Sequence, residues 1–277
     1  MALPGTVSKP ADATAPAGNK FERVEGMIKS LQSVATHFIV ALFWGKTKTG
    51  KTTLGASFEK PLLLIDVRER GTKSIEGIAG ISVYPLESWD DFEQIYYYLA
   101  NSNHGFKTVV IDTLTQLQDL ALEKVVTSKG RPVTDKRNKG DWLDAATLMK
   151  VWLQAYKNLG DRMNIIFLAQ YRERINEDET TTRQVAPTCG ANLMASMQGY
   201  VEALVDINGW VHIDEIPTFD EKTKQTRGEL KHCLMVKPDG IYSVGIRLPE
   251  GYYCPDRIID PSYEKILEVL HPVKKGE

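Results

Sequence analysis

The sequence has few cysteines, no long apolar run and almost no net charge. Its 277 residues include Cys189, Cys233 and Cys254, which are far apart and form no CxxC pair. This spacing excludes a disulfide scaffold and a cysteine zinc site, and it indicates reduced thiols. No run approaches the ~18 apolar residues of a membrane span, and the N-terminus has no signal-peptide core. A net charge of −2 leaves only local patches for nucleic acid. We expect a cytoplasmic protein.

Composition divides the chain into a short tail and one domain. Residues 1–19 are rich in Ala, Pro, Gly, Ser and Thr, with almost no large apolar side chain. Such a segment cannot bury enough apolar surface to fold, so we expect a disordered tail. The remaining residues, 20–277, are long enough for one domain with a large core, since 42% of the whole chain is hydrophobic.

Apolar runs alternate with helical patterns along this domain. Strands that are apolar throughout, separated by helices, predict an α/β fold with a mainly parallel central sheet covered by helices on both faces. Antiparallel hairpins are predicted near the C-terminus. The predicted strands are 37–44, 61–66, 81–84, 108–112, 164–169, 204–213, 230–236 and 242–248. The predicted helices are 22–31, one that begins near 51, 88–100, one that ends near 126, 142–159, 191–203 and 263–270.

The first of these strands leads into a complete phosphate-binding loop. Residues 45–52 read GKTKTGKT, which matches GxxxxGK[ST] between a strand and a helix. Two glycines let main-chain N–H groups surround phosphates at the positive end of the helix. Lys51 is expected to reach the β- and γ-phosphates, and Thr52 to bind Mg²⁺. The loop predicts binding of ATP with Mg²⁺ through Gly45, Lys46, Thr47, Lys48, Thr49, Gly50, Lys51, Thr52 and Thr53.

The strand 108–112 ends in an acid, which is the Walker B pattern. Val109, Val110 and Ile111 would bury this strand, and Asp112 at its carboxyl end would bind Mg²⁺ beside Thr52. Any buried strand can end in an aspartate, so the assignment depends on the phosphate-binding loop upstream.

Hydrolysis also needs a group that orients or deprotonates the attacking water. Glu69, in the loop after the strand 61–66, is the candidate base, and Asp66 is the alternative. Either acid could instead be a strand-end residue that pairs with Arg68 or Arg70. Gln170, a polar residue at the end of an apolar strand, is expected to sense the γ-phosphate.

Two polar segments are candidates for DNA contact. The first spans residues 128–141. The second follows Gln170 and carries Arg172 and Arg174, although nearby acids weaken its positive field. Loops of this kind hold the phosphates of single-stranded DNA in a salt-sensitive manner, but many are simply solvated. The first segment, residues 128–141, carries Lys129, Arg131, Lys136, Arg137 and Lys139.

Together these motifs resemble the RecA-like P-loop ATPases, in particular the phage-encoded ones associated with single-strand annealing. The resemblance covers roughly 20–261. It rests on Lys51 and Thr52, a carboxylate after the second strand, Asp112 followed by Thr113, and Gln170. The base in that family is a glutamate at the second strand, which Glu69 matches only with a one-residue shift. The choice between Glu69 and Asp66 therefore stays open.

The resemblance implies an AAA/RecA-like nucleotide-binding domain with a C-terminal β extension over residues 20–277. It implies an ATPase that acts on single-stranded DNA in recombination or annealing, together with a single-strand-binding protein, in the cytoplasm of a bacterial host. Family members assemble as rings or filaments. A cation from the neighbouring subunit commonly completes each of their sites, and Lys237 and Arg247 are the candidates here.

Two other functions fit a phosphate-binding loop. One is a kinase that phosphorylates a small molecule, and the other is a non-enzymatic, nucleotide-gated adaptor of a replication or packaging complex. Kinases tend to place the Walker B strand directly beside the strand that precedes the loop. A polar Gln170 at the end of the strand after Walker B indicates an intervening sensor strand, which favours the ATPase.

Overall fold

The computed structural model describes residue 28 and residues 38–174, 188–220 and 225–271. The predicted tail lies outside these residues, as does the predicted helix 22–31 apart from residue 28. From Phe38 onward the chain forms one compact unit. Within the described residues, no helix has the length and apolar content needed to cross a membrane.

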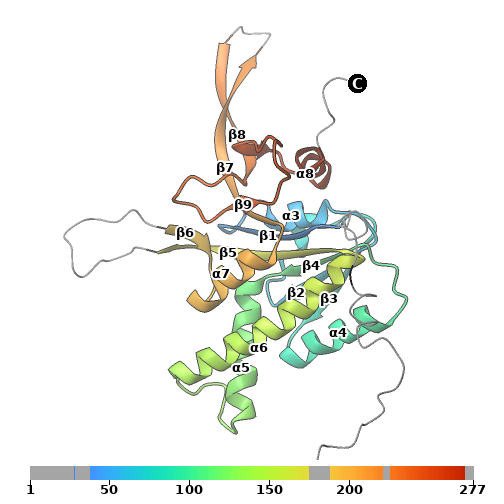
Figure 1. Ribbon diagram of the computed structural model, residues 1–277, viewed down its shortest axis with the longest axis vertical. Coiled ribbons are helices and arrows are strands. Elements are labelled where there is room, and N and C mark those ends of the chain that lie inside the picture. The colour runs from blue at the N-terminus through green and yellow to red at the C-terminus, as the bar shows by residue number, and fades with distance from the viewer. Residues whose placement is uncertain (1–27, 29–37, 175–187, 221–224, 272–277) are drawn as a thin grey trace, which may run out of the picture. The chain divides into compact units, whose positions relative to one another are not determined.

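Strands and helices alternate along the chain and then give way to strands (Figure 1). The strands are β1 (Val40–Gly45), β2 (Leu62–Val67), β3 (Ile81–Leu86), β4 (Thr108–Asp112), β5 (Asn164–Arg174), β6 (Thr188–Ala191), β7 (Ile207–Asp220), β8 (Gln225–Met235), β9 (Gly245–Ile246) and β10 (Arg257–Ile259). The helices are α3 (Lys51–Ala56), α4 (Trp89–Asn101), α5 (Leu114–Ser128), α6 (Lys139–Asn158), α7 (Ala195–Leu204) and α8 (Tyr263–Leu270), with 3₁₀ turns η1 (Gly71–Ile75) and η2 (Leu159–Asp161).

The strands form one sheet in the order β10-β8-β7-β1-β5-β4-β2-β3, with β6 beside β5 and β9 beside β7. All pairs from β7 through β1 to β3 are parallel. The strands β8 and β10 are antiparallel to their neighbours. The predicted α/β fold is therefore confirmed. The strand β5 separates β1 from β4, as the polar end of β5 predicted.

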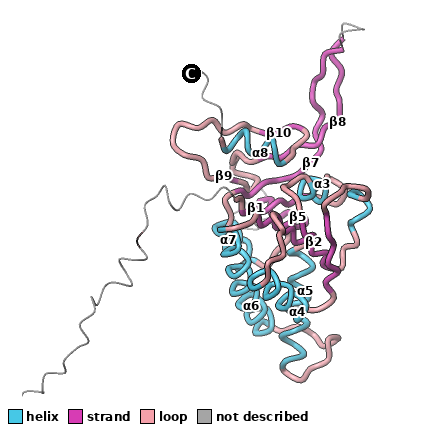
Figure 2. Tube along the Cα trace, turned by 90° about the vertical axis from the view of Figure 1, so that its right-hand side faces the viewer, coloured by secondary structure: helices cyan, strands magenta, loops and turns pink. Residues whose placement is uncertain are grey.

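Helices cover both faces of the sheet, because its central strands are apolar on both sides. Along β1, Leu42 and Trp44 belong to the core formed with α4, α5, α6 and α7. The alternate residues Ala41 and Phe43 belong to the core that includes α3 and α8. Every residue of β1 is buried, as expected for a parallel strand between two helical layers. Figures 1 and 2 show α4–α7 below the sheet and α3 and α8 above it.

The strands β7 and β8 continue beyond the sheet as a two-stranded arm (Figures 1 and 2). Antiparallel strands are present near the C-terminus as predicted, but of the predicted strands 230–236 and 242–248 only the first is a strand over most of its length. The strand β8 pairs with β7 along its whole length, and only Gly245–Ile246 of the other segment forms a strand, which also pairs with β7.

The predicted helix 191–203 begins later than expected, at Ala195. Residues 188–191 instead form β6, which pairs antiparallel with the extension of β5 as far as Arg174. The segment after Gln170 thus begins as a strand and not as a loop. The cysteines are free thiols, two of them buried.

Candidate nucleotide-binding site

The phosphate-binding loop connects β1 to α3. One of its glycines is required by its backbone angle and the other by a close contact. Gly50 has φ of 94°, in the left-handed region that glycine adopts without strain. A Cβ on Gly45 would lie 2.1 Å from the carbonyl oxygen of Val211 in β7. The loop is therefore fixed against β7, and its main chain opens at the N-terminus of α3, where anions are favoured.

Lys51 is held within this loop. Its Nζ donates to the carbonyl oxygens of Gly45 at 3.0 Å and Lys46 at 2.8 Å, and the residue is only 8% exposed. Burial lowers the pKa of Lys51, while the nearby charges of Asp112 and Glu69 oppose this shift. The ammonium therefore lies at the loop, and phosphate oxygens could replace the two carbonyl oxygens that now accept its hydrogen bonds.

Thr52 and Asp112 meet beside the loop. The Thr52 hydroxyl, in the first turn of α3, donates at 2.7 Å to Oδ2 of Asp112, the last residue of β4. Burial raises the pKa of Asp112 to about 6, although the Thr52 hydrogen bond lowers it. One hydroxyl and one carboxylate oxygen at this spacing fit Mg²⁺, which prefers oxygen ligands and keeps several waters.

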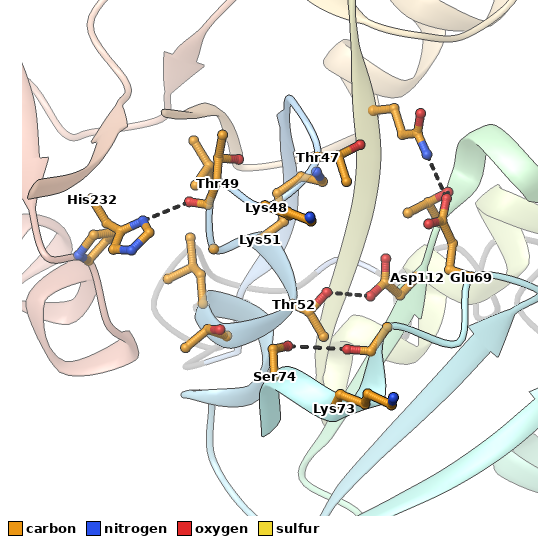
Figure 3. Close-up of a pocket in the computed structure, with 18 of the residues that line it drawn as sticks. Thr47, Lys48, Thr49, Lys51, Thr52, Glu69, Lys73, Ser74, Asp112 and His232 are labelled. Carbon is orange, nitrogen blue, oxygen red and sulfur yellow. Dashed lines mark hydrogen bonds between the residues drawn. The ribbon is translucent and has the colours of Figure 1, made fainter. Parts of the chain in front are cut away.

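Glu69 and Asp66 have different surroundings. Glu69 Oε1 accepts from Gln170 Nε2 at 2.7 Å and from the Thr113 hydroxyl at 3.3 Å, and Figure 3 shows Glu69 beside Asp112. Asp66 is buried, and its Oδ1 accepts from the main-chain N–H groups of Glu69 and Arg70. Asp66 therefore shapes the turn that presents Glu69.

A pocket of about 700 Å³ brings these groups together. It reaches from Glu69 and Asp112 on one side, past the phosphate-binding loop, to His232 of β8 on the other (Figure 3). Sequence reasoning missed several lining residues. Two of them lie within four residues after Glu69, which could have been a clue, whereas those from β8 and the segment after β10 gave no local signal. The missed residues include Arg70, Lys73, His232, Asp260 and Pro261.

The structure does not bring the first basic segment to this pocket. Lys129 and Arg131 both pair with Asp141, at 2.9 and 2.8 Å, and Arg137 donates to main-chain carbonyls within the segment. Lys136 and Lys139 are exposed and have no ion pair in the described part of the chain. This connection between α5 and α6 lies at the helix ends that point away from the sheet (Figures 1 and 2).

The other predicted cations also lie outside the pocket. Arg172 is exposed on β5, and Arg174 donates to the carbonyl of Leu193; most of the predicted second loop, 175–187, lies outside the described residues. Lys237 pairs with Asp256 at 2.7 Å, and Arg247 with Asp206 at 3.1 Å. Neither Lys237 nor Arg247 lines the nucleotide pocket of its own chain.

Comparison with known proteins gives one curated relative and a set of similar folds. The chain is 25% identical over 138 residues to the SPbeta prophage-derived uncharacterized protein YorG of Bacillus subtilis, an alignment that covers 48% of this chain. It spans only 41% of that relative's length. Among solved structures, the flagellar accessory protein FlaH of Methanocaldococcus jannaschii matches 80% of this chain and 84% of its own, with 10% identity and a TM-score of 0.37.

A family model described as an AAA domain matches residues 37–231, more than half of the chain. The matched region begins just before β1 and ends in β8, so it contains the phosphate-binding loop, Glu69, Asp112 and Gln170. The chain belongs to the AAA domain family of P-loop nucleoside triphosphatases.

Proposed function

We propose that this protein hydrolyses ATP with Mg²⁺ and acts on single-stranded DNA in phage-type recombination or annealing, as a ring or filament in the host cytoplasm. The hydrogen bond from Gln170 to Glu69, beside the Thr52–Asp112 pair, carries the hydrolytic part of this proposal. These four side chains lie at one end of a single pocket, which supports roles for Glu69 as base, Gln170 as sensor, and Thr52 and Asp112 as Mg²⁺ ligands.

Each residue of the site would have a separate role in hydrolysis. Bound Mg²⁺ would neutralise charge on the β- and γ-phosphates. Glu69 accepts a proton from, or orients, the attacking water, while Lys51 exchanges its carbonyl acceptors for phosphate oxygens. Gln170 would exchange its bond to Glu69 for one to the γ-phosphate, which links nucleotide state to the extension of β5.

Cations in the pocket would stabilise the charge that develops on the transferred phosphoryl group. Arg70 and Lys73 come from the same segment as Glu69 and have no ion pair in the described part of the chain, so they are candidates within the same subunit. Lys237 and Arg247 remain the candidates from a neighbouring subunit.

The strand β5 between β1 and β4 favours an ATPase over a small-molecule kinase. The DNA part rests on the exposed cations Lys136, Lys139 and Arg172, and the phage part on the similarity to a prophage-derived protein. A single-strand-binding protein is the partner expected to deliver such DNA.

The test is ATP turnover with and without single-stranded DNA, for the wild type and Lys51→Ala. Stimulated turnover that Lys51→Ala abolishes is the expected result, because the ammonium meets charge that grows in the transition state. Turnover only with a small acceptor would indicate a kinase, and tight binding without turnover would indicate an adaptor. Full hydrolysis by folded Lys51→Ala protein would exclude the proposed site.

A further inference from the structure

The nucleotide pocket has two chemically different ends. Glu69 and Asp112 define the end for the γ-phosphate and Mg²⁺, and the loop itself holds the phosphates. Figure 3 shows His232 on the opposite side of the loop from these acids. On the proposed function, the nucleoside must extend toward the His232 side, because the other end is occupied by the reacting groups.

The residues at this second end come from the C-terminal strands and were not part of any motif. They lie close together because the main-chain N–H of Asp260 donates to the carbonyl oxygen of His232 at 2.7 Å. Pro261 follows directly, and Val211 of β7 and Leu54 of α3 also line the pocket. The end thus combines apolar surfaces, suited to the faces of a base, with two polar side chains.

Both of these polar side chains present acceptors. A ring nitrogen of His232, Nδ1, lies 3.0 Å from the carbonyl oxygen of Thr49. Because a carbonyl only accepts, Nδ1 donates, and in the tautomer that carries its proton on Nδ1 the other nitrogen, Nε2, is an acceptor. The Asp260 carboxylate is also acceptor-only. Within the described residues its ion pair is with Lys231 and is long at 3.8 Å, whereas Lys231 lies 2.7 Å from Glu229.

We propose that His232, Asp260 and Pro261 form the base subsite and select a purine with an amino group at its 6-position, namely adenine. Pro261, which is partly exposed beside Asp260, would contact one face of the ring. The 6-amino group of adenine would donate to Asp260 or His232, whereas the 6-carbonyl oxygen of hypoxanthine or guanine would meet acceptors. An unmatched polar group at a binding site is strongly disfavoured, so the subsite discriminates.

The test is calorimetric titration of the full-length protein with ATP, ITP and GTP, for the wild type and Asp260→Asn. The wild type should bind ATP at least about tenfold more tightly than ITP or GTP, the effect of one hydrogen bond to a charged group. In Asp260→Asn this preference should fall toward unity, since an amide both donates and accepts. Asparagine also tolerates the left-handed backbone of this position, where φ is 47°, so the variant should fold.

Asp214→Asn is the matched control. Asp214 is a similarly exposed carboxylate, 42% against 49%, it pairs with Arg257 of β10, and it does not line the nucleotide pocket. Its variant should keep the wild-type preference for ATP.

The outcomes separate this inference from the function on which it rests. Equal affinity of the wild type for ATP and ITP, or an unchanged preference in Asp260→Asn, would overturn the base subsite and leave the phosphate site intact. GTP binding as tight as ATP would overturn the choice of adenine. Failure of the folded wild type to bind any of the three would overturn the proposed function as well.

Discussion

Asp66 and Glu69 are two acids of one turn, and their different hydrogen-bond partners indicate different roles. Oδ1 of Asp66 accepts from two main-chain N–H groups of the turn, so its role is to hold the backbone. Glu69 instead faces the pocket and accepts from side chains of β5 and the end of β4. A group that must reach a water needs the second environment and not the first.

Glu69→Gln is therefore expected to lower kcat by about 10²–10⁴, the usual contribution of a general base, while ATP binding changes little. Single-turnover hydrolysis and nucleotide titration measure the two effects separately. Asp66→Asn serves as the comparison, and its main effect should be a lower Tm, because the carboxylate supports the turn. Undiminished hydrolysis by Glu69→Gln would mean that another group is the general base.

The phosphate-end residues could be predicted because each belongs to a short motif at a strand end. Lys51, Thr52, Asp112 and Gln170 all lie where the pattern of strands and loops places them. His232 could not, because its contact with Thr49 joins residues 183 positions apart and depends on the register of β8. No periodicity in the sequence determines that register when both strands extend beyond the sheet.

At the scale of elements, the connection between α5 and α6 contains two kinds of cation. Asp141 has no exposed side-chain surface and accepts from Lys129, Arg131 and the main chain of Asn138, with which it forms the capping box of α6. These contacts lower the pKa of Asp141, the Asn138 N–H most of all, followed by Arg131 and Lys129. Lys129 and Arg131 are therefore structural at this position.

Asp141→Asn should reduce stability in a pH-dependent way. A depressed carboxyl pKa stabilises the folded state above the unfolded pKa of about 3.9, and this contribution is lost as the pH falls. Unfolding by urea should thus show a large difference from the wild type at pH 7 that shrinks toward pH 3. Asp144→Asn, which removes only the exposed partner of Lys129, should change little. A difference that does not depend on pH would contradict the ionic explanation.

The other cations of the connection, Lys136 and Lys139, are free to meet phosphates. Replacing both by Ala should weaken single-stranded DNA binding and reduce its log–log salt slope by about 1.4, since each phosphate contact contributes about 0.7. Thermal stability and basal ATP turnover should stay unchanged. Fluorescence anisotropy at several salt concentrations measures the slope. Lys107→Ala with Lys157→Ala, an equal loss of charge elsewhere, is the control; an equal effect of both pairs would mean that the connection is merely solvated.

At the scale of the whole molecule, the sequence predicted the helical layers on both faces of the sheet but not the two-stranded arm of β7 and β8. Continuous apolar strands such as β4 and β5 require helices on both sides, so the parallel sheet followed from the pattern of apolar runs along the chain. The arm could not be predicted in the same way, because its strands extend beyond the sheet and, in the described part of the chain, are not covered by helices (Figure 1). Ile213, Phe219 and Leu230 remain exposed on it, at 47%, 56% and 73%, and the alternation they create also occurs in half-buried strands.

Assembly can be tested by mixing inactive subunits. Lys237 and Arg247 lie outside their own pocket, so either can serve catalysis only at a neighbour's site. Mixing Lys51→Ala with Lys237→Ala or Arg247→Ala protein should restore turnover, since some sites combine an intact loop with an intact cation from the next subunit. Arg70→Ala is the control. Arg70 and Lys51 line the same pocket, so no mixed site contains both, and turnover should not recover. Full activity of Lys237→Ala and Arg247→Ala alone would exclude both residues, and complementation by Arg70→Ala would place Arg70 at the neighbour's site instead.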